Sequence, residues 1–190
     1  MEVVLVLCGT TRLLTGRGVA RLVRAGSQPA VNASLRRLAE EGLVYAEEAG
    51  NAYLYTFNRQ HLAAPALEQL AAIRSELERR LRAEIAGWEI APAHASIFGS
   101  AARGDGDQSS DIDVFVVRPR GVPEDDPCWR MQLDRLSEHV QAWTGNRVGL
   151  SEVCATDVRR LRRERPPIVE ALRTEAINLA GATASELLGV

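Results

Sequence analysis

The sequence predicts an α+β protein with two domains: a small helical domain that carries a β-hairpin, then a domain whose mixed β-sheet is flanked by helices. Three observations support this class. The chain has 190 residues, of which 46% are hydrophobic, enough for two small cores. Its first third contains segments with apolar residues at helical spacing, and residues typical of turns separate these segments. Its second half holds short runs of branched apolar residues between amphipathic segments. We expect domains at residues 1–62 and 88–181, a linker helix at 63–87 and a tail at 182–190.

Composition argues against several classes of protein. No apolar run approaches the roughly 18 residues that cross a bilayer, so we expect no membrane partner. The first residues lack the basic start and cleavage site of a signal peptide, which favours a cytoplasmic location. The three cysteines, Cys8, Cys128 and Cys154, have no metal-binding spacing, and we expect free thiols rather than a disulfide framework or a zinc site.

In the first domain, capping and turn residues divide the chain into short elements. Residues 3–7 are apolar enough for either a helix or a strand. Thr15 and Ser27 are placed as the N-caps of two helices, and Gly42 is placed to end the second. Two strand-forming runs on either side of Gly50 predict a β-hairpin.

Helix, turn, helix and hairpin in this order resemble a winged helix-turn-helix domain of the MarR/ArsR kind, and the passage from Leu35 to Val44 carries the resemblance. Gln28, Asn32 and Arg36 recur at i, i+4 and i+8 on one face of the second helix. The resemblance implies DNA binding and transcription regulation, with this face in the major groove. Arg37, beside it, would contact a phosphate.

A second interpretation of the first domain remains open. The domain could be a protein-interaction module that keeps the fold without binding DNA. Glu47 and Glu48 lie on the predicted hairpin, where a phosphate backbone would repel them. The polar face of the second helix is also that of an ordinary solvated helix.

An apolar stripe at three- and four-residue spacing predicts one long helix from Pro65 to about Ala86. Its members are Leu67, Leu70, Ile73, Leu77, Leu81 and Ile85. The stripe could pack against the same stripe of a second copy in a homodimer, since winged-helix regulators commonly read two half-sites. Alternatively, it could pack against the second domain.

The second domain is predicted to alternate strands and helices. We expect strands at residues 94–98, 112–117 and 147–153, and helices at 127–144, 157–165 and 168–175. The acidic cluster at 124–126 is placed to cap the first of these helices. The helix that begins at Asp157 carries five arginines between Arg159 and Arg165, either as a solvated face or as a contact for nucleic acid or triphosphate.

The central feature of the sequence is a pair of acids at the start of the second strand. Because side chains alternate along a strand, Asp111 and Asp113 project to the same face while their neighbours point into the core. Two close carboxylates repel each other unless a cation lies between them, and Mg²⁺ held by carboxylates and substrate phosphates fits best. Gly99 and Ser100 end the preceding strand and start a helix whose free N–H groups favour an anion.

Gly99-Ser100, ten intervening residues and Asp111-x-Asp113 resemble the signature of the DNA polymerase β-type nucleotidyltransferase superfamily, above all its minimal, stand-alone prokaryotic members. The match covers roughly residues 94–117. The resemblance implies that Asp111 and Asp113 are the catalytic ligands of a two-metal Mg²⁺ site, and that the enzyme transfers a nucleoside monophosphate from an NTP to a hydroxyl.

The same resemblance suggests how the nucleotide and the acceptor are bound. Gly99 and Ser100 would hold the β- and γ-phosphates, and Arg103 would neutralise phosphate charge. The acceptor would be a protein side chain, as in the toxin–antitoxin nucleotidyltransferases, a small molecule or a nucleic-acid end.

One departure from the family concerns the third carboxylate, which its members generally carry on the strand after the long helix as a metal ligand or base. The outward positions of that strand are Arg147, Gly149 and Ser151, none of them acidic. Glu152 is the remaining candidate for a catalytic acid, and a bulge would have to re-aim it. The alternative function is therefore a DNA-binding regulator whose degenerate transferase domain senses a nucleotide without catalysis.

Overall fold

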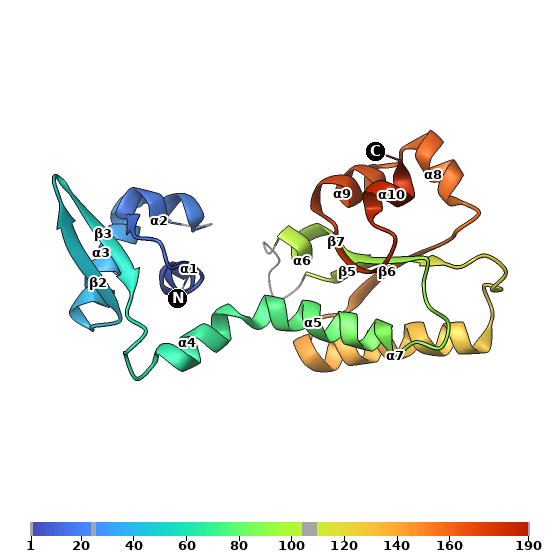
Figure 1. Cartoon of the computed structure of the whole chain (residues 1–190), viewed down its shortest axis with the longest axis horizontal. Helices are drawn as coiled ribbons and strands as arrows, with labels where there is room; N and C mark the ends of the chain where they lie inside the picture. Colours follow the sequence, from blue (N-terminus) through green and yellow to red (C-terminus); the bar gives the residue numbers. More distant parts are fainter. Residues whose placement is uncertain (1, 24–25, 104–109, 190) are drawn as a thin grey trace. The chain divides into compact units, whose positions relative to one another are not determined.

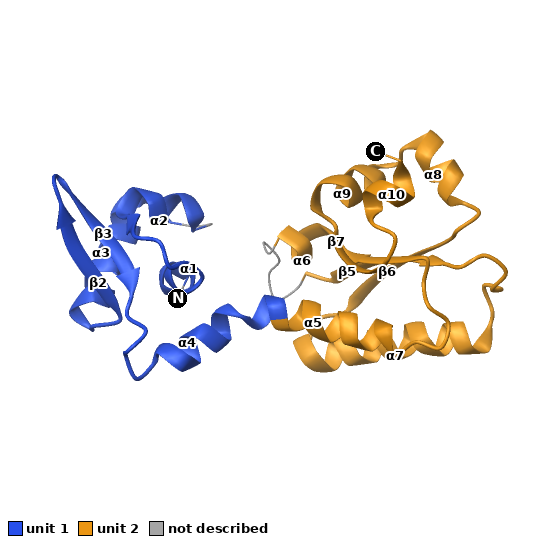
Figure 2. Cartoon of the chain, viewed as in Figure 1, with its two compact units in different colours: residues 1–75 blue, residues 76–190 orange. Residues whose placement is uncertain are grey.

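The computed structural model describes residues 2–23, 26–103 and 110–189, so most of the polar loop that follows Arg103 lies outside it. The chain forms two compact units, residues 1–75 and 76–190 (Figures 1 and 2). Both units mix helices with β-sheet, which confirms the α+β class expected from the sequence. None of the helices in the described ranges combines the length and the apolar character that crossing a bilayer requires.

Unit 1 is a group of short helices with a three-stranded antiparallel sheet in the order β1-β3-β2. Its elements are α1 (Glu2–Cys8), β1 (Leu14–Thr15), α2 (Gly16–Leu22), α3 (Gln28–Glu40), β2 (Val44–Ala49), β3 (Ala52–Phe57) and α4 (Ala64–Ala71). Residues 3–7, for which the sequence left helix and strand open, are helical. The predicted hairpin is β2 and β3, which pair from Val44 with Phe57 to Ala49 with Ala52.

The predicted caps account for where the helices of unit 1 begin. The Thr15 hydroxyl accepts a hydrogen bond from the Gly18 N–H at 3.0 Å. The Ser27 hydroxyl accepts one from the Ala30 N–H at 3.4 Å. Each bond satisfies a backbone donor that the first helical turn leaves unpaired.

The core of unit 1 gathers one apolar side from each of its elements. Leu7 of α1, Val19 of α2 and Leu35 of α3 are fully buried, and Val44 and Phe57 close the core from the hairpin. The outer strand β2 is exposed beyond its first residue, so the hairpin is anchored at its base. This arrangement leaves the outer face of α3 available to solvent.

The linker segment forms two helices instead of the single one that the apolar stripe predicted: α4 ends at Ala71 and α5 runs from Ile73 to Ala86. The stripe divides with them, because Leu67 packs in the core of unit 1 while Leu81 and Ile85 are buried in that of unit 2. Between them Leu70 and Ile73 are 45% and 60% exposed. The N–H of Ala72 is shared between the carbonyls of Glu68 and Gln69, a geometry common at helix ends.

Unit 2 is built on a mixed four-stranded sheet in the order β6-β5-β4-β7. Its further elements are β4 (His94–Ile97), α6 (Gly99–Arg103), β5 (Ile112–Arg118), α7 (Pro127–Thr144), β6 (Val148–Cys154), α8 (Val158–Glu164), α9 (Pro167–Glu175), β7 (Ile177–Gly181) and α10 (Ala184–Leu188). Strands β5 and β6 are parallel, while β4 is antiparallel to both β5 and β7.

Helices cover both faces of this sheet (Figure 1). Val114 and Val116 of β5 face α5 and α7, where they pack with Leu81, Trp129 and Leu133. Phe115 and Val117 face the opposite layer of α8, α9 and α10. Burial on both faces explains why β5 is almost continuously apolar and why the polar Asp113 near its start is conspicuous.

Strand β7 and helix α10 were not expected from the sequence. The buried imidazole of His94 helps to fix this region, because its Nδ1 lies 2.6 Å from the carbonyl oxygen of Ala182 and its Nε2 lies 2.9 Å from the Ser96 hydroxyl. We assign the proton to Nδ1, since the carbonyl can only accept. Burial lowers the pKa of His94, which keeps it neutral for this role.

Two glycines with positive φ provide a test of how closely β7 approaches the start of β4. Gly181 has φ of +70° and Gly121 has φ of +84°, but only at Gly181 would an added Cβ collide with backbone, at the Ala93 carbonyl. Gly121→Ala should therefore destabilise unit 2 by about 1–2 kcal/mol from φ strain alone. Gly181→Ala should add a packing clash and reach roughly 3 kcal/mol or more, as measured by urea denaturation. Equal losses for the two variants would contradict this placement of β7.

Candidate active site

The two predicted acids lie at the entry of β5. Asp113 is the second residue of the strand and pairs with Gly149 of β6, while Asp111 immediately precedes the strand. Partial burial raises the pKa of Asp113, and the negative charge of Asp111 raises it further, whereas Arg103 acts in the opposite direction. The structure therefore brings both Asp111 and Arg103 within electrostatic reach of Asp113.

The carboxylate of Asp113 is enclosed by the backbone of two glycines. A Cβ added to Gly99 would stand 2.5 Å from Oδ2 of Asp113, and one added to Gly149 would stand 2.6 Å from Oδ1. Gly99 also has a φ of +66°, a conformation that other residues rarely adopt. Both positions therefore exclude any side chain while Asp113 keeps this rotamer.

Backbone hydrogen bonds hold the acids in register with the neighbouring strands. The N–H of Phe98 donates to the carbonyl of Asp113 at 3.1 Å, and the N–H of Ile112 donates to that of Arg147 at 2.8 Å. The Asn146 side chain donates to the carbonyl of Ser110 at 2.7 Å, directly before Asp111. Asn146 was not singled out from the sequence, because its partner lies 36 positions away.

The predicted phosphate-binding residues lie on the short helix α6, which begins at Gly99 beside Asp113. Ser100 is partly buried in its first turn, so the start of the helix and the acids form one polar corner. Arg103 ends the helix, and its guanidinium donates to Glu175 at the end of α9 at 2.6 Å. Glu175 was not identified from the sequence, and it fixes where the charge of Arg103 is presented.

The donor set fits Mg²⁺ as a partial site. The described residues contain no cluster of three or more His, Cys, Asp or Glu side chains that could hold a metal ion. Asp111 and Asp113 supply carboxylate oxygens only, and Mg²⁺ is commonly held by one or two carboxylates together with substrate phosphates and water. The mutual repulsion that raises the pKa of Asp113 would be relieved by a cation.

Glu152, predicted as a catalytic acid, lies on the other face of the sheet, which corrects that expectation. It pairs with Val116 in the β5–β6 register and shares its side of the sheet. Its carboxylate accepts hydrogen bonds from Arg118 at 2.8 Å, from the Trp129 indole at 2.9 Å and from Arg130 at 2.9 Å. The strand has no bulge there, so Glu152 keeps the parity that its position in the sequence dictates.

The position on β6 at which a third acid would be expected is Gly149, the glycine that packs on Asp113. Gly149 lies directly opposite Asp113 in the parallel register, and Ser151 lies opposite Phe115. An acidic side chain at position 149 would collide with Asp113 in its present rotamer. The candidate site of this chain therefore consists of two acids, a glycine-lined turn and an arginine.

The residues predicted to contact DNA lie on α3 in unit 1. Gln28 donates from its side chain to that of Asn32 at 3.1 Å, so these two amides act as a pair. Arg36 and Arg37 are exposed. Tyr53 of the hairpin has a raised pKa, mainly because its hydroxyl donates a hydrogen bond to Glu48, and Arg36 acts against this shift.

Comparisons with known proteins address unit 2. Residues 70–170 match the family model described as a nucleotidyltransferase domain. A comparison with curated proteins finds no match. One similar solved structure is a toxin–antitoxin with AMP-PNP, at 15% identity and a TM-score of 0.41, and another is a mutant of the toxin–antitoxin MntA-HpeT, at 13% identity and the same TM-score. Each similarity covers 59% of this chain and 81% of the other.

The position of Glu152 leads to a prediction about stability. Glu152→Gln removes the charge that compensates Arg118, whose side chain is only 10% exposed, and should destabilise unit 2 by about 3 kcal/mol in urea denaturation. The matched control is Glu124→Gln, which lies 3.9 Å from the same Arg118 but is 84% exposed, and should cost less than about 0.5 kcal/mol. A Glu152→Gln protein with unchanged stability and lost transferase activity would restore the catalytic assignment.

Proposed function

Because the chain belongs to the nucleotidyltransferase-domain family, we propose that unit 2 transfers a nucleoside monophosphate from an NTP to an acceptor hydroxyl and releases pyrophosphate. The observation that carries this proposal is the Asp113 carboxylate enclosed between Gly99 and Gly149 beside Asp111. These polar groups lie at the start of β5, which is otherwise apolar, and they do not contribute to the hydrophobic core. They are suited to a ligand that brings both a cation and phosphates.

The nucleotide is proposed to bind along the start of α6. Gly99 lets the backbone approach the triphosphate closely, and the Ser100 hydroxyl can donate to a phosphate oxygen. Arg103, oriented by Glu175, neutralises phosphate charge from the end of the same helix. When bound, Mg²⁺ would be held by Asp111 and Asp113 and would supply stabilisation of the charge that develops on the phosphates.

The reaction replaces a phosphoanhydride bond of the NTP with a phosphoester bond to the acceptor. The acceptor oxygen forms a bond to the α-phosphorus, the bond from that phosphorus to the pyrophosphate oxygen breaks, and the hydroxyl proton leaves. A protein side chain, a small molecule and a nucleic-acid end all carry a suitable hydroxyl. The proposed role of this chain is to position the nucleotide, because neither Gly149 nor Ser151 can take the proton as a carboxylate would.

A second candidate function is favoured by Gly149 and Ser151, the two positions at which a third acid is missing. Without a third acid, unit 2 could bind an NTP without turning it over, and a DNA-binding unit 1 would make the chain a nucleotide-sensing transcriptional regulator. Incubation with labelled NTP, Mg²⁺ and cell lysate separates the two candidates. Label transferred to an acceptor supports the transferase, whereas a nucleotide-dependent shift of promoter DNA without turnover supports the regulator.

For unit 1 we propose a winged helix-turn-helix domain that binds DNA through α3. The order of its elements and the β1-β3-β2 sheet support this proposal, as does the exposure of Arg36 and Arg37. A homodimer would allow two half-sites to be read, and Leu70 and Ile73 are exposed apolar residues that a second copy could cover. Glu47 and Glu48 on the hairpin argue that the hairpin itself stays off the phosphate backbone.

Asp113→Asn tests the transferase site. Transfer of label should fall by roughly a thousandfold, because the stabilisation that a metal ion supplies is worth several kcal/mol. Asp134→Asn, on the exposed side of α7, is the matched control and should retain activity. Survival of the label in Asp113→Asn would reject the assignment of Asp113.

The same variant makes a prediction about the pH dependence of stability. The pKa of Asp113 is raised in the folded protein, by burial first and then by Asp111. Between the ordinary and the raised pKa the folded state binds more protons than the unfolded state, so this carboxyl lowers stability as the pH rises through that window. In the absence of metal, Asp113→Asn should therefore gain stability relative to the wild type above the window, as measured by urea denaturation at several pH values.

Arg36→Ala tests the DNA proposal. If Arg36 reads a base edge, binding to DNA from the chain's own promoter region should weaken by about 1–3 kcal/mol, and discrimination against scrambled DNA should fall. Arg17→Ala, an exposed arginine on α2, serves as a control for the loss of one positive charge. An equal loss on promoter and scrambled DNA in mobility-shift assays would show that Arg36 contacts only phosphate.

A further inference from the structure

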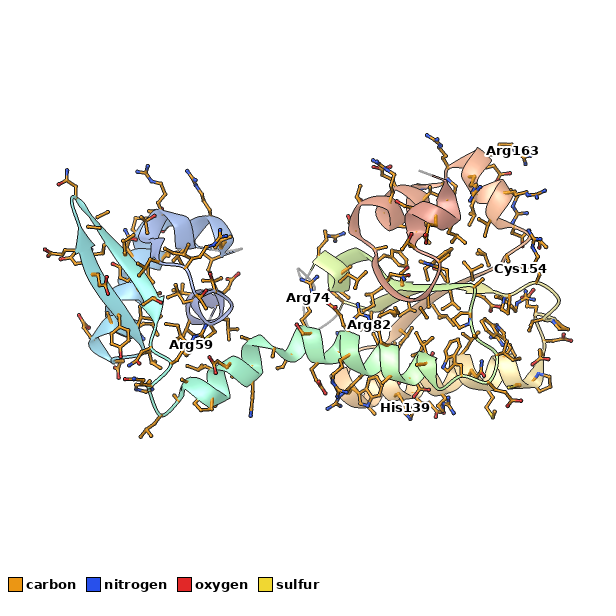
Figure 3. The ribbon with its side chains drawn as sticks, viewed as in Figure 1. Arg59, Arg74, Arg82, His139, Cys154 and Arg163 are labelled. Atoms are coloured by element: carbon orange, nitrogen blue, oxygen red, sulfur yellow. The ribbon has the colours of Figure 1, made fainter. Side chains whose placement is uncertain are left out.

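A dense positive surface lies on α8, in unit 2. Its arginines, here called the α8 arginines, are Arg159, Arg160, Arg162 and Arg163 on the helix and Arg165 at its C-cap, and all are exposed. Residues 158–165 contain only one acid, Glu164, in a protein whose formal net charge is −2. Figure 3 shows Arg163 projecting from the outer side of this helix.

The protein's own carboxylates leave most of this charge uncompensated. Arg162 donates to the backbone carbonyls of Leu187 at 2.8 Å and Glu186 at 3.0 Å, which fastens α8 to α10 without cancelling a formal charge. Among the carboxylates that the structure describes, Arg163 reaches only that of its neighbour Glu164, at 3.4 Å. Arg159 and Arg160 have no carboxylate partner within the described part of the chain. An external anion can therefore approach α8 without breaking an ion pair between elements.

The surroundings of α8 favour a polyanion over a membrane or an apolar protein interface. Both apolar residues of the helix face inward: Val158 is buried and Leu161 packs against the same core. Among the described residues, no large hydrophobic side chain after Met131 is exposed. An interfacial membrane helix needs an exposed apolar face, and a stable protein interface needs an apolar centre. Among the residues described around α8, neither feature is present.

The α8 arginines also lie away from the proposed nucleotide site. Helix α8 follows the far end of β6, whose Cys154 is five positions beyond Gly149, so roughly 17 Å of strand separates the helix from the level of Asp113. Helix α6 packs against α9, and α10 packs against both α8 and α9, so two helices lie between the phosphate-binding turn and α8 (Figure 1). Triphosphate bound at Gly99 would not reach this surface.

We propose that the outer face of α8, centred on Arg159, Arg160 and Arg163, binds the phosphate backbone of a nucleic acid. Guanidinium groups pair with phosphate oxygens in a bidentate geometry, and Arg163 lies about one helical turn from Arg159 and Arg160, so these arginines can reach neighbouring phosphates. Binding here depends on charge and carries no direct base readout. The surface is separate from the proposed DNA-reading face of α3 and does not depend on transferase activity.

The test is binding of labelled nucleic acid to the full chain without NTP, followed by fluorescence anisotropy between about 50 and 200 mM salt. The probes are a single-stranded RNA and a duplex DNA of scrambled sequence, each roughly 20 nucleotides or base pairs long, which distinguish RNA from DNA as the ligand. Arg159→Ala/Arg163→Ala should raise the Kd at least about tenfold on the preferred probe. It should also lower the slope of log Kd against log salt by about 1.4 for single strands or 1.8 for duplex.

Matched variants make the result specific to α8. Arg79→Ala/Arg120→Ala removes the same charge from two exposed positions elsewhere and should leave both Kd and slope close to wild type. Arg159→Lys/Arg163→Lys keeps the charge and should retain most of the binding. An unchanged Kd and slope in the Arg159→Ala/Arg163→Ala protein, or an equal loss in the Arg79→Ala/Arg120→Ala protein, would overturn the proposal.

Discussion

The position of one carboxylate constrains the rest of unit 2. Asp113 fits between Gly99 and Gly149 only because β4, β5 and β6 meet in a single register, with β4 ending at the turn into α6. A shift of β6 by one residue would bring Val148 or Leu150 against the acid and turn the apolar side of the strand away from α7. Burial of the two faces of the sheet therefore fixes the geometry of the polar corner at its edge.

The register of the strands also separates Asp113 from Glu152, two acids that look equivalent in the sequence. Gly149 has no room for a side chain, and this removes the third acid from the position where the family's pattern would place it. Glu152 lies only three residues further on, but the alternation of the strand sends it to the opposite face, where Arg118, Arg130 and Trp129 hold it. Asp113 therefore lies in the polar corner between Gly99 and Gly149, whereas Glu152 joins β6 to α7.

Local signals in the sequence were sufficient for most elements. Thr15, Ser27 and Asp126 form the side-chain caps expected of them, and the helix after Asp126 has the predicted bounds 127–144. Strand β7 escaped prediction because Ile177–Gly181 is a short edge strand containing Asn178 and a glycine, and its apolar alternation covers only three residues. The division of the linker helix escaped as well, because an apolar stripe does not reveal that two separate cores share it.

The residue types of the candidate site could be predicted from the sequence, but the hydrogen-bond partners of these residues could not. The spacing of Asp111 and Asp113 is enough to place them on one side of a strand. In contrast, the pairing of Arg103 with Glu175 and of Asn146 with Ser110 joins residues 72 and 36 positions apart, and only the folded chain brings them together. These contacts belong to the tertiary structure, so no local sequence pattern predicts them.

Unit 2 combines two opposite electrostatic surfaces. The acids at the start of β5 favour a cation, and the α8 arginines favour an anion, with roughly 17 Å of strand between the two levels. This separation exceeds the Debye length of about 8 Å at physiological salt, so most of the attraction between the surfaces is screened where solvent lies between them. On the solvent side, a polyanion on α8 and a nucleotide at Asp113 would therefore influence each other little, and the two proposals do not exclude one another.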